Sequence, residues 1–421
     1  MKLSAFGSST AVKLKPVKIL HTADWHMNSW LGRVDLSDDI KAALRQIAGY
    51  LEEHHVDVML VAGDLFSERL RDAGMHDAIS AIREIFGPFA LRGGAILAVA
   101  GNHDAELKFE TLRETLALGR GSERFVITAH PLLHVLEDAQ GQKVQFVLMP
   151  YPTSRAYLDS NATYQTLEEK NRMVQANFGA ALDALKARID PNLPAVLVSH
   201  VHVRGAQGHS LYKISESDDV VFDPSQIPLE WVYAAYGHIH KPGPAVAGAP
   251  HVRYSGSPIA LDAAERHDSK GCVLFEIVDG KIAGDLQILP LHGPRLHQLT
   301  IDLTREAPAV ALSRLKDEIG AGDLVRYTLA YDPADEHPIA QIKAQINETL
   351  GRVYGGDEEV RHAAIGEAPL VPDAARERLD VPALVREYLA KNLSENSESA
   401  AILALAEELL AAGAHHNKDE C

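Results

Sequence analysis

The segment that most constrains this chain is ILAVAGNHDA, residues 96 to 105, in which an apolar run stops at a glycine. Polar side chains follow at once, namely Asn102, His103 and Asp104. A short apolar run of this kind is typical of a buried strand, so an amide, an imidazole and a carboxylate stand where the strand ends. We interpret this strand end as part of a chemical site.

Other apolar segments of the chain end in the same way, in the stretches ILHTADWH, VMLVAGDLF, VLVSHVH and YAAYGHIH. In open α/β sheets the carboxyl ends of the strands meet at one crevice. We therefore expect side chains from remote parts of the sequence to lie together there. The candidate residues are Asp24, His26, Asp64, Asn102, His103, His200, His238 and His240.

The spacing within two of these motifs suits metal binding. Asp24 and His26 are two residues apart, as are His238 and His240, and in an extended backbone this spacing places both side chains on one side. Each pair can therefore bind one ion. A glycine, which permits a sharp turn, precedes a candidate ligand at Gly63, Gly101 and Gly237.

The ligand types indicate both the metal and the substrate class. Two carboxylates, Asp24 and Asp64, leave a net positive charge on a pair of divalent ions, so the site favours an anion. Two metals about 4 Å apart can activate water and bind both the attacking and the leaving oxygen of a phosphate ester. Histidine-rich ligation favours Mn, Fe or Zn over Mg or Ca, and does not choose among those three.

Each motif taken alone is weak, because the chain has 21 histidines and a chance H-x-H pair such as His200 and His202 is easy to find. The repetition of ligand-type residues at successive strand ends argues against chance. For Asp104, orienting a neighbour or capping the next helix is the better interpretation than binding metal.

Composition limits the class of protein. With 421 residues we expect two domains, or one large domain with appendages. No apolar stretch of about 18 residues predicts a membrane span, and the only cysteines, Cys272 and Cys421, fit a reducing cytoplasm. The net charge of −17 argues against sequence-independent binding to nucleic acid unless metal ions, a local basic surface or a partner protein compensates.

The order of predicted elements indicates an α/β fold. Strands and helices alternate in the first third of the chain, and later strands follow one another without helices between them. We expect a flexible leader, a main α/β domain, a smaller α/β domain, a helical arm and a disordered tail. Their predicted ranges are 1–16, 17–292, 293–370, 371–412 and 413–421.

The arm contains two predicted amphipathic helices joined by the polar link SENSES. Their apolar positions, which include Leu384 and Leu405, can pack back on the chain's own domain or bind a partner. The terminal position and the polar link favour binding a partner.

The order D-x-H, GD, GNHD, H and GHIH resembles that of the calcineurin-like metallophosphoesterases. The stretches ILHTADWH and YGHIHKP, and YSGSP followed by Lys270 and Gly271, resemble the SbcD-type nuclease subunits within that superfamily. The resemblance is strong over about residues 17–275. It implies a four-layer α/β sandwich with a capping, DNA-binding domain over 293–370.

The resemblance also implies roles for individual residues. One metal would be bound by Asp24, His26, Asp64 and His240, and the other by Asp64, Asn102, His200 and His238. Asp64 would bridge the two ions, and His103 would face the scissile phosphate as the catalytic residue. The sequence departs from the superfamily pattern at Ser67, where an Asp or His is common, and Glu68 or Asp104 is a candidate to compensate.

The implied function is a manganese-dependent DNA nuclease of the cytoplasm, active as an exonuclease on double strands and as an endonuclease on single strands or hairpins. The implied partners are DNA, a second copy of the chain, and an SbcC-type coiled-coil ATPase bound through the C-terminal helices. Two alternatives stay open. One is a small-molecule or nucleotide phosphodiesterase or phosphatase, and the other is a weakly catalytic subunit that binds DNA ends.

Overall fold

The computed structural model describes residues 15–68, 71–117, 124–138, 141–159, 163–206, 220–320, 322–335, 338–361 and residue 406. The predicted leader over 1–16 lies outside these residues except for its last two, as do residues 362–370 of the predicted smaller domain. Almost all of the arm predicted over 371–412 and the whole predicted tail also lie outside them. The chain divides into one unit of Met1–Tyr331 with Glu336–Glu359, and a second of Asp332–Asp335 with Val360–Cys421.

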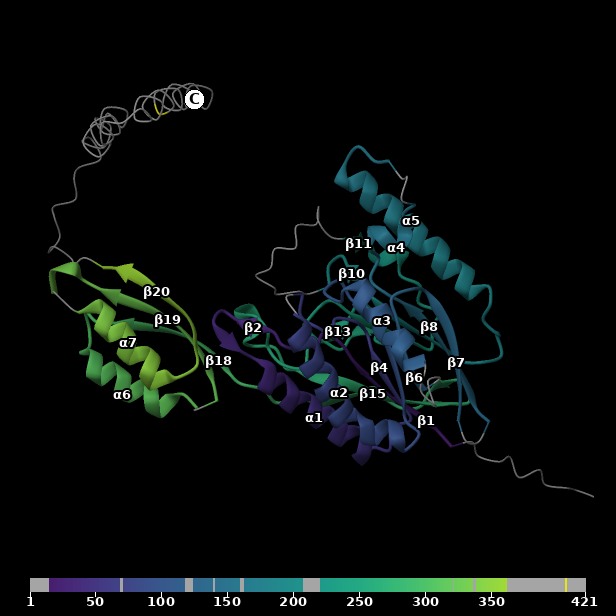
Figure 1. Ribbon diagram of the computed structural model, residues 1–421, viewed down its shortest axis with the longest axis horizontal. Coiled ribbons are helices and arrows are strands. Elements are labelled where there is room, and N and C mark those ends of the chain that lie inside the picture. The colour runs from purple at the N-terminus through teal and green to yellow at the C-terminus, as the bar shows by residue number, and fades with distance from the viewer. Residues whose placement is uncertain are drawn as a thin grey trace, which may run out of the picture. The chain divides into compact units, whose positions relative to one another are not determined.

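Two large sheets form the main body of the first unit (Figure 1). The first has the order β16-β15-β1-β4-β5-β6, with β17 also paired to β15. Its strands are β1 (Val17–Thr22), β4 (Val58–Val61), β5 (Ala95–Val99), β6 (Phe125–Thr128), β15 (Gly271–Val278), β16 (Lys281–Ile282) and β17 (Gln287–Pro290). The run from β1 through β4 and β5 to β6 is parallel, so these strands end at the same edge.

The second sheet has the order β13-β14-β12-β9-β8-β7. Its strands are β7 (Leu132–Glu137), β8 (Lys143–Met149), β9 (Ala195–His200), β12 (Tyr233–Gly237), β13 (Gly243–Pro244) and β14 (Val252–Tyr254). The run from β8 through β9 and β12 to β14 is parallel. Short two-stranded pairs are formed by β2 (Trp30–Leu31) with β3 (Val34–Asp35), and by β10 (His202–Val203) with β11 (Val221–Phe222).

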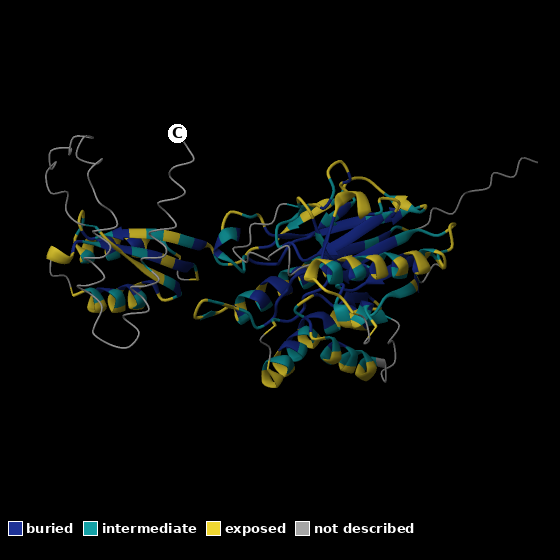
Figure 2. Cartoon of the chain, turned by 90° about the horizontal axis from the view of Figure 1, so that it is seen from above, coloured by how far each residue is buried: buried dark blue, intermediate teal, exposed yellow. Residues whose placement is uncertain are grey.

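Helices cover the outer face of each sheet. The first sheet packs against α1 (Ser37–Glu53), α2 (Asp72–Leu91) and α3 (Glu106–Ala117), and the second against α4 (Ser154–Tyr157) and α5 (Leu167–Lys186). Between the sheets, side chains such as Leu97, Phe146 and Phe275 form a buried core, and Figure 2 shows the strands there as buried. The predicted α/β four-layer fold class is confirmed.

A smaller three-stranded sheet follows, with the order β18-β19-β20. It consists of β18 (Leu296–Asp302), β19 (Leu324–Tyr331) and β20 (Val353–Val360), with helices α6 (Pro308–Glu318) and α7 (Ile339–Leu350). Ile301, Leu315 and Ile346 belong to its own core, while Leu296 and Tyr354 belong to the core beside α1. The domain boundary expected at residue 293 stays a prediction.

One strand suggested by the sequence differs from the structure. The apolar pattern over 282–289 predicts one strand, but β16 ends at Ile282 and β17 begins at Gln287. Gly284, whose φ is 71°, lies in the turn between them, and this left-handed backbone cannot continue a strand. Among the described residues, no helix is long and apolar enough to cross a membrane.

Candidate metal centre

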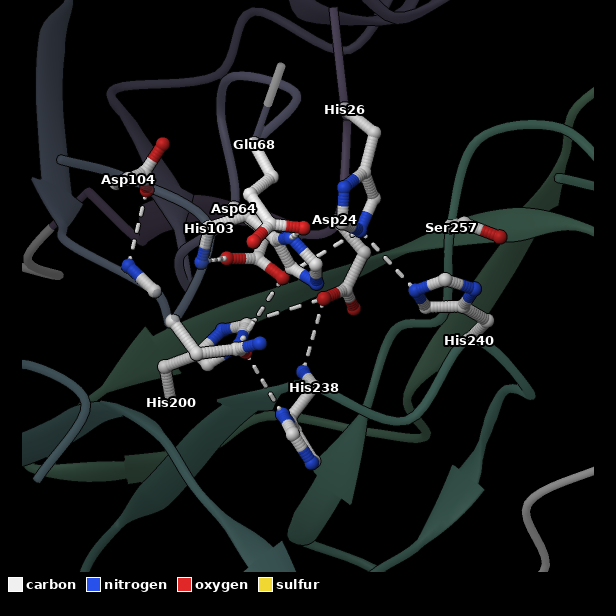
Figure 3. A network of polar contacts seen from close by, with 12 residues as sticks. Asp24, His26, Asp64, Glu68, His103, Asp104, His200, His238, His240 and Ser257 are labelled. Carbon is white, nitrogen blue, oxygen red and sulfur yellow. Dashed lines mark hydrogen bonds and ion pairs between the residues drawn. The ribbon is translucent and has the colours of Figure 1, made fainter. Parts of the chain in front are cut away.

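The candidate side chains predicted from the sequence lie together at the carboxyl ends of the parallel strands (Figure 3). Asp24 and His26 follow β1, Asp64 follows β4, and Asn102 and His103 follow β5. From the second sheet, His200 is the last residue of β9, and His238 and His240 follow β12. The site therefore forms where the ends of both sheets meet.

Asp64 lies between two groups of ligand-type atoms. Its Oδ2 atom is 3.4 Å from His26 Nε2 and 3.4 Å from His200 Nε2. Three sets of ligand atoms here lie within 4.8 Å of one another, from Asp24, His26 and His240, from His26, Asp64 and His103, and from Asp24, Asp64 and His200. Asp64 belongs to two of these sets, as does Asp24. A carboxylate placed between two such groups has the position that a bridging ligand needs.

Asn102 completes the side of the site that belongs to the second sheet. Its Oδ1 atom lies 3.0 Å from His200 Nε2 and 3.0 Å from His238 Nδ1. Oxygen and nitrogen donors from three different strand ends therefore converge on one point.

The hydrogen bonds behind the rings select which nitrogen faces the centre. His200 Nδ1 lies 2.8 Å from the carbonyl oxygen of Ala62, so in the neutral ring Nδ1 carries the proton and Nε2 is left as a ligand. His240 Nδ1 lies 2.7 Å from Glu265 Oε1, with the same consequence. Its Nε2 atom lies 3.1 Å from His26 Nε2.

The backbone around the ligands is strained. Asp24, Asp64 and His238 have φ values of 53°, 52° and 102°, in the left-handed region that residues other than glycine rarely adopt. Such conformations cost on the order of 1–3 kcal/mol each and persist at functional sites where the surroundings enforce them. His26, with a φ of 45°, is in the same region. The prediction that the ligand pairs two residues apart stand on an extended backbone is therefore wrong at Asp24, His26 and His238, because the chain turns sharply where β1 and β12 end.

Two of the three glycines serve close packing rather than a turn. Gly63 has a φ of 92°, as its place before a candidate ligand predicts. Gly101 and Gly237 are not in the left-handed region, but a Cβ at Gly101 would lie 2.1 Å from Asp64 Oδ1, and one at Gly237 would lie 1.9 Å from Ala62 O. Glycine is therefore needed at Gly101 and Gly237 because a neighbouring loop packs closely against the backbone there. At Gly63 it is needed because the backbone is left-handed.

A family profile described as calcineurin-like phosphoesterase matches residues 17–242, more than half of the chain. The chain belongs to this family. The match ends just after His240 and so spans every candidate ligand. As a member of this family, the chain is a metal-dependent hydrolase. Its cofactors are divalent metal ions.

Its relatives include proteins named as a subunit of the nuclease SbcCD. The one from Escherichia coli strain K12 is 28% identical over 276 residues, which covers 63% of this chain and 66% of that protein. The Bacillus subtilis protein is 25% identical, with 66% and 71% covered, and the Rhodobacter capsulatus protein is 28% identical, with 79% and 84% covered. The chain thus matches just under two thirds of the length of the Escherichia coli relative.

The donor set of this calcineurin-like phosphoesterase fits metal cations. Asp24 Oδ2 is buried and has no hydrogen-bond partner among the described residues, an arrangement that a bound cation would relieve. Burial lowers the pKa of His26 to about 3, so its ring is neutral and able to bind a metal. Burial alone would lower the pKa of His200, but the Asp64 carboxylate raises it to about 9, so a cation bound there would displace a proton. Burial alone would raise the pKa of Asp64, but His200 and His26 bring it well below its ordinary value.

Asp104 does not face the metal centre. Its carboxylate accepts hydrogen bonds from the backbone amides of Gly101, Phe66 and Leu65, at 2.9, 3.0 and 3.2 Å. These amides belong to the loops after β5 and β4, so Asp104 holds the loop of Asp64 against that of His103. Of the interpretations that the sequence allowed, orienting a neighbour describes this geometry.

His103 lies beside the candidate ligands and is accessible to solvent, with a side chain that is 33% exposed. Its ring centroid is 4.9 Å from that of His26. Its Nδ1 atom lies 3.9 Å from Glu68 Oε2, whereas Asp104 points away from it. Of the candidates to compensate for Ser67, Glu68 is the one near the imidazole.

Sequence reasoning missed some residues that support the site. Tyr151 stacks on His238 with ring centroids 5.9 Å apart, and Glu265 accepts the hydrogen bond from His240. Lys270 falls within the family resemblance but carries no predicted role. Tyr151 follows the end of β8 but is not a usual metal ligand, so the strand-end pattern alone does not select it. Glu265 follows neither the strand-end pattern nor a ligand spacing, so no signal in a single sequence marks it.

Proposed function

We propose that the chain is a two-metal DNA nuclease that cleaves double strands as an exonuclease and single strands or hairpins as an endonuclease. The observation that carries this proposal is the position of Asp64, equally distant from His26 and His200. A second support is the name of the relatives, which are called a subunit of the nuclease SbcCD.

The proposed ligand sets are those that the family resemblance implies, and the Asn102 oxygen that lies 3.0 Å from His200 and His238 supports the second set. Asp24, His26, Asp64 and His240 would bind one ion, and Asp64, Asn102, His200 and His238 the other. Bound there, the ions would supply Lewis-acid activation of water and neutralise charge on the phosphate. We propose manganese as the metal, and iron and zinc also suit a histidine-rich set.

The side chains of this chain contribute positioning and proton transfer. His103, exposed beside the centre, protonates the leaving oxygen or stabilises charge on the phosphate. Its backbone amide donates to Asp64 Oδ1 at 2.9 Å, so its place depends on the bridging carboxylate. Glu68 limits the rotation of the imidazole, and Asp104 fixes the loop on which it stands.

The proposed partners are DNA, a second copy of the chain and an SbcC-type coiled-coil ATPase. The relatives are named as subunits, which supports a partner protein. The net charge of −17 is consistent with a partner that binds much of the DNA. We assign contact with the ATPase to the predicted helices over 371–412.

The test compares substrates under one set of conditions. Purified protein with manganese is given end-labelled duplex DNA, a DNA hairpin, single-stranded DNA and a nucleotide phosphodiester, with and without the ATPase subunit. We expect cleavage of the DNA substrates, and none by the Asp64→Ala variant. Turnover of the nucleotide phosphodiester alone, with intact DNA in every mixture, would contradict the nuclease proposal.

A second function is favoured by one observation, the net charge of −17. A strongly acidic protein repels a polyanion more than it repels a small substrate, so a small-molecule phosphodiesterase would need no compensating partner. The same substrate panel separates the two functions. A protein that binds DNA ends but cleaves none of the substrates would instead fit a mainly structural subunit.

A further inference from the structure

A buried group of charged side chains lies directly behind His240. Glu265 ends the short 3-10 helix Ala263–Glu265, Lys270 immediately precedes β15, and Ser257 follows β14. Glu265 is 2% exposed, Lys270 is 8% exposed and Ser257 is 0% exposed. Lysine and glutamate are rarely buried so completely unless they are paired, and burying such a pair gives little net stability. Their position calls for an explanation other than stability.

Glu265 divides its two carboxylate oxygens between two tasks. Oε1 accepts the hydrogen bond from His240 Nδ1 at 2.7 Å. Oε2 accepts from Lys270 Nζ at 2.6 Å and from the backbone amide of Leu261 at 3.2 Å. The carboxylate therefore connects the imidazole of His240 to the ammonium group of Lys270.

Lys270 holds the main chain of the same histidine. Besides Glu265, its Nζ atom donates to the carbonyl oxygen of His240 at 2.9 Å and to Ser257 Oγ at 2.9 Å. Ser257 can accept this bond because its own hydroxyl donates to Ile259 O at 2.8 Å. An ammonium group has three protons, and each of them is used here.

His240 is thus held at both ends, at its ring by Glu265 and at its carbonyl oxygen by Lys270. The bond to Glu265 keeps the Nδ1 proton on the side away from the centre and leaves Nε2 facing His26. A carboxylate behind a ligating imidazole fixes its tautomer and orientation, and loss of such a partner typically weakens metal binding 10–100-fold.

We propose that Glu265 and Lys270 are positioning residues that hold the imidazole of His240 in the tautomer and orientation that bind the first metal ion. The inference rests on the proposed metal centre, but not on the identity of the substrate. Lys270 balances the buried charge of Glu265 and fixes the backbone from which the ring projects. Neither residue touches the ion.

The test measures manganese binding by isothermal titration and electron paramagnetic resonance, without DNA. In Glu265→Gln an NH2 group, which donates, replaces one of the two accepting oxygens, so either His240 or Lys270 faces a donor. We expect Glu265→Gln and Lys270→Met to bind one ion as the wild type does and the other about 10–100-fold more weakly. The control is Glu358→Gln, which removes an exposed carboxylate that pairs with Lys343 at 2.6 Å, and which should bind both ions normally.

A double variant distinguishes a role in positioning the His240 ring from a role in protein stability alone. In Glu265→Gln with Lys270→Met, the single amide oxygen is free to accept from His240, so binding of the weakened ion should partly recover. Nitrogen-15 spectra of the histidine rings should show the Nδ1-protonated form of His240 in the wild type and its loss in Glu265→Gln. A role confined to stability would move the melting temperature and leave both of these measurements unchanged.

The outcomes separate this inference from the proposed function. A folded Glu265→Gln protein that binds both ions with wild-type affinity would overturn the inference, whatever the protein cleaves. If wild type binds two ions and Glu265→Gln loses one, but no DNA is cut, the inference stands and the nuclease proposal fails. If both single variants misfold, Ser257→Ala decides, because it removes one acceptor of Lys270, and unchanged binding there would also overturn the inference.

Discussion

The backbone amide of His103 donates a hydrogen bond to Asp64 Oδ1 at 2.9 Å. The other oxygen of the same carboxylate faces His26 and His200 at 3.4 Å. One side chain therefore contacts the backbone of His103, the proposed substrate-facing residue, with one oxygen and two candidate metal ligands with the other. The proposed metal centre and the proposed catalytic residue depend on the same carboxylate.

This arrangement makes the two residues separable by mutation. His103→Ala keeps every proposed ligand and the backbone amide, so the variant should retain its metal and lose DNA cleavage by about 100-fold or more. Asp64→Ala removes the bridge and should lose both. Elemental analysis of the purified variants measures the metal, and normal metal content in Asp64→Ala would count against the bridging role.

Glu68 should have a smaller effect. Its carboxylate is 3.9 Å from His103 Nδ1 and its side chain is 76% exposed, so solvent weakens the interaction. We expect Glu68→Gln to lower the cleavage rate about two- to fivefold with manganese binding unchanged. Glu114→Gln, an exposed substitution on α3, is the matched control. Equal rates for both variants would show that Glu68 does not replace the residue missing at Ser67.

Gly101 should be intolerant of the smallest side chain. A Cβ there would lie 2.1 Å from Asp64 Oδ1 and 2.4 Å from the Asp64 amide nitrogen, so Asp64 would have to move. We expect Gly101→Ala to destabilise the protein by about 1–3 kcal/mol and to lose metal binding. At Gly49, within α1, no atom lies within 4 Å of an added Cβ, and Gly49→Ala should raise the free energy of unfolding by about 1 kcal/mol. Urea unfolding measures both variants.

The candidate ligands could be predicted because each follows an apolar strand directly. The strands β1, β4 and β5 are parallel, as are β9 and β12, so a local pattern at each strand end places the side chains at one edge. The sharp turns at these ends are also local, and Gly63 marks one of them.

The partners of the supporting residues could not be predicted, because they depend on tertiary contacts. The sequence suggests that Asp104 orients a neighbour but does not say which one, and it gives no role to Glu265. Glu265 meets His240 across 25 residues, and Asp104 meets the amide of Leu65 across 39. Neither spacing has a period that a helix or a strand would produce. The break at Gly284 escapes prediction because its neighbours Ile282 and Leu286 are apolar enough to suggest one continuous strand.

His21 should make the fold sensitive to acid. The ring is fully buried, with Nδ1 2.9 Å from the hydroxyl of Tyr233, and burial lowers its pKa to about 3 from the ordinary 6.5. Above pH 6.5 the ring is neutral in both the folded and the unfolded chain, so its contribution is fully present. As the pH falls from 6.5 towards 3, the unfolded chain binds a proton that the folded chain does not, and stability falls by roughly 1.4 kcal/mol per pH unit.

The measurement is the free energy of unfolding in urea at pH 7 and pH 5 for the wild type and His21→Leu. Other titrating groups contribute to both proteins, so the difference between the two slopes isolates His21. We expect the variant to lose less stability between these pH values than the wild type does. Identical slopes would mean that the buried ring takes up its proton without cost.

The central claim is that the carboxylate of Asp64 joins two metal ions, and anomalous diffraction from crystals grown with manganese tests it most directly. We expect two peaks about 4 Å apart, one beside His26 and His240 and the other beside Asn102 and His200, with Asp64 between them. A single peak, or manganese bound only away from these residues, would contradict the claim.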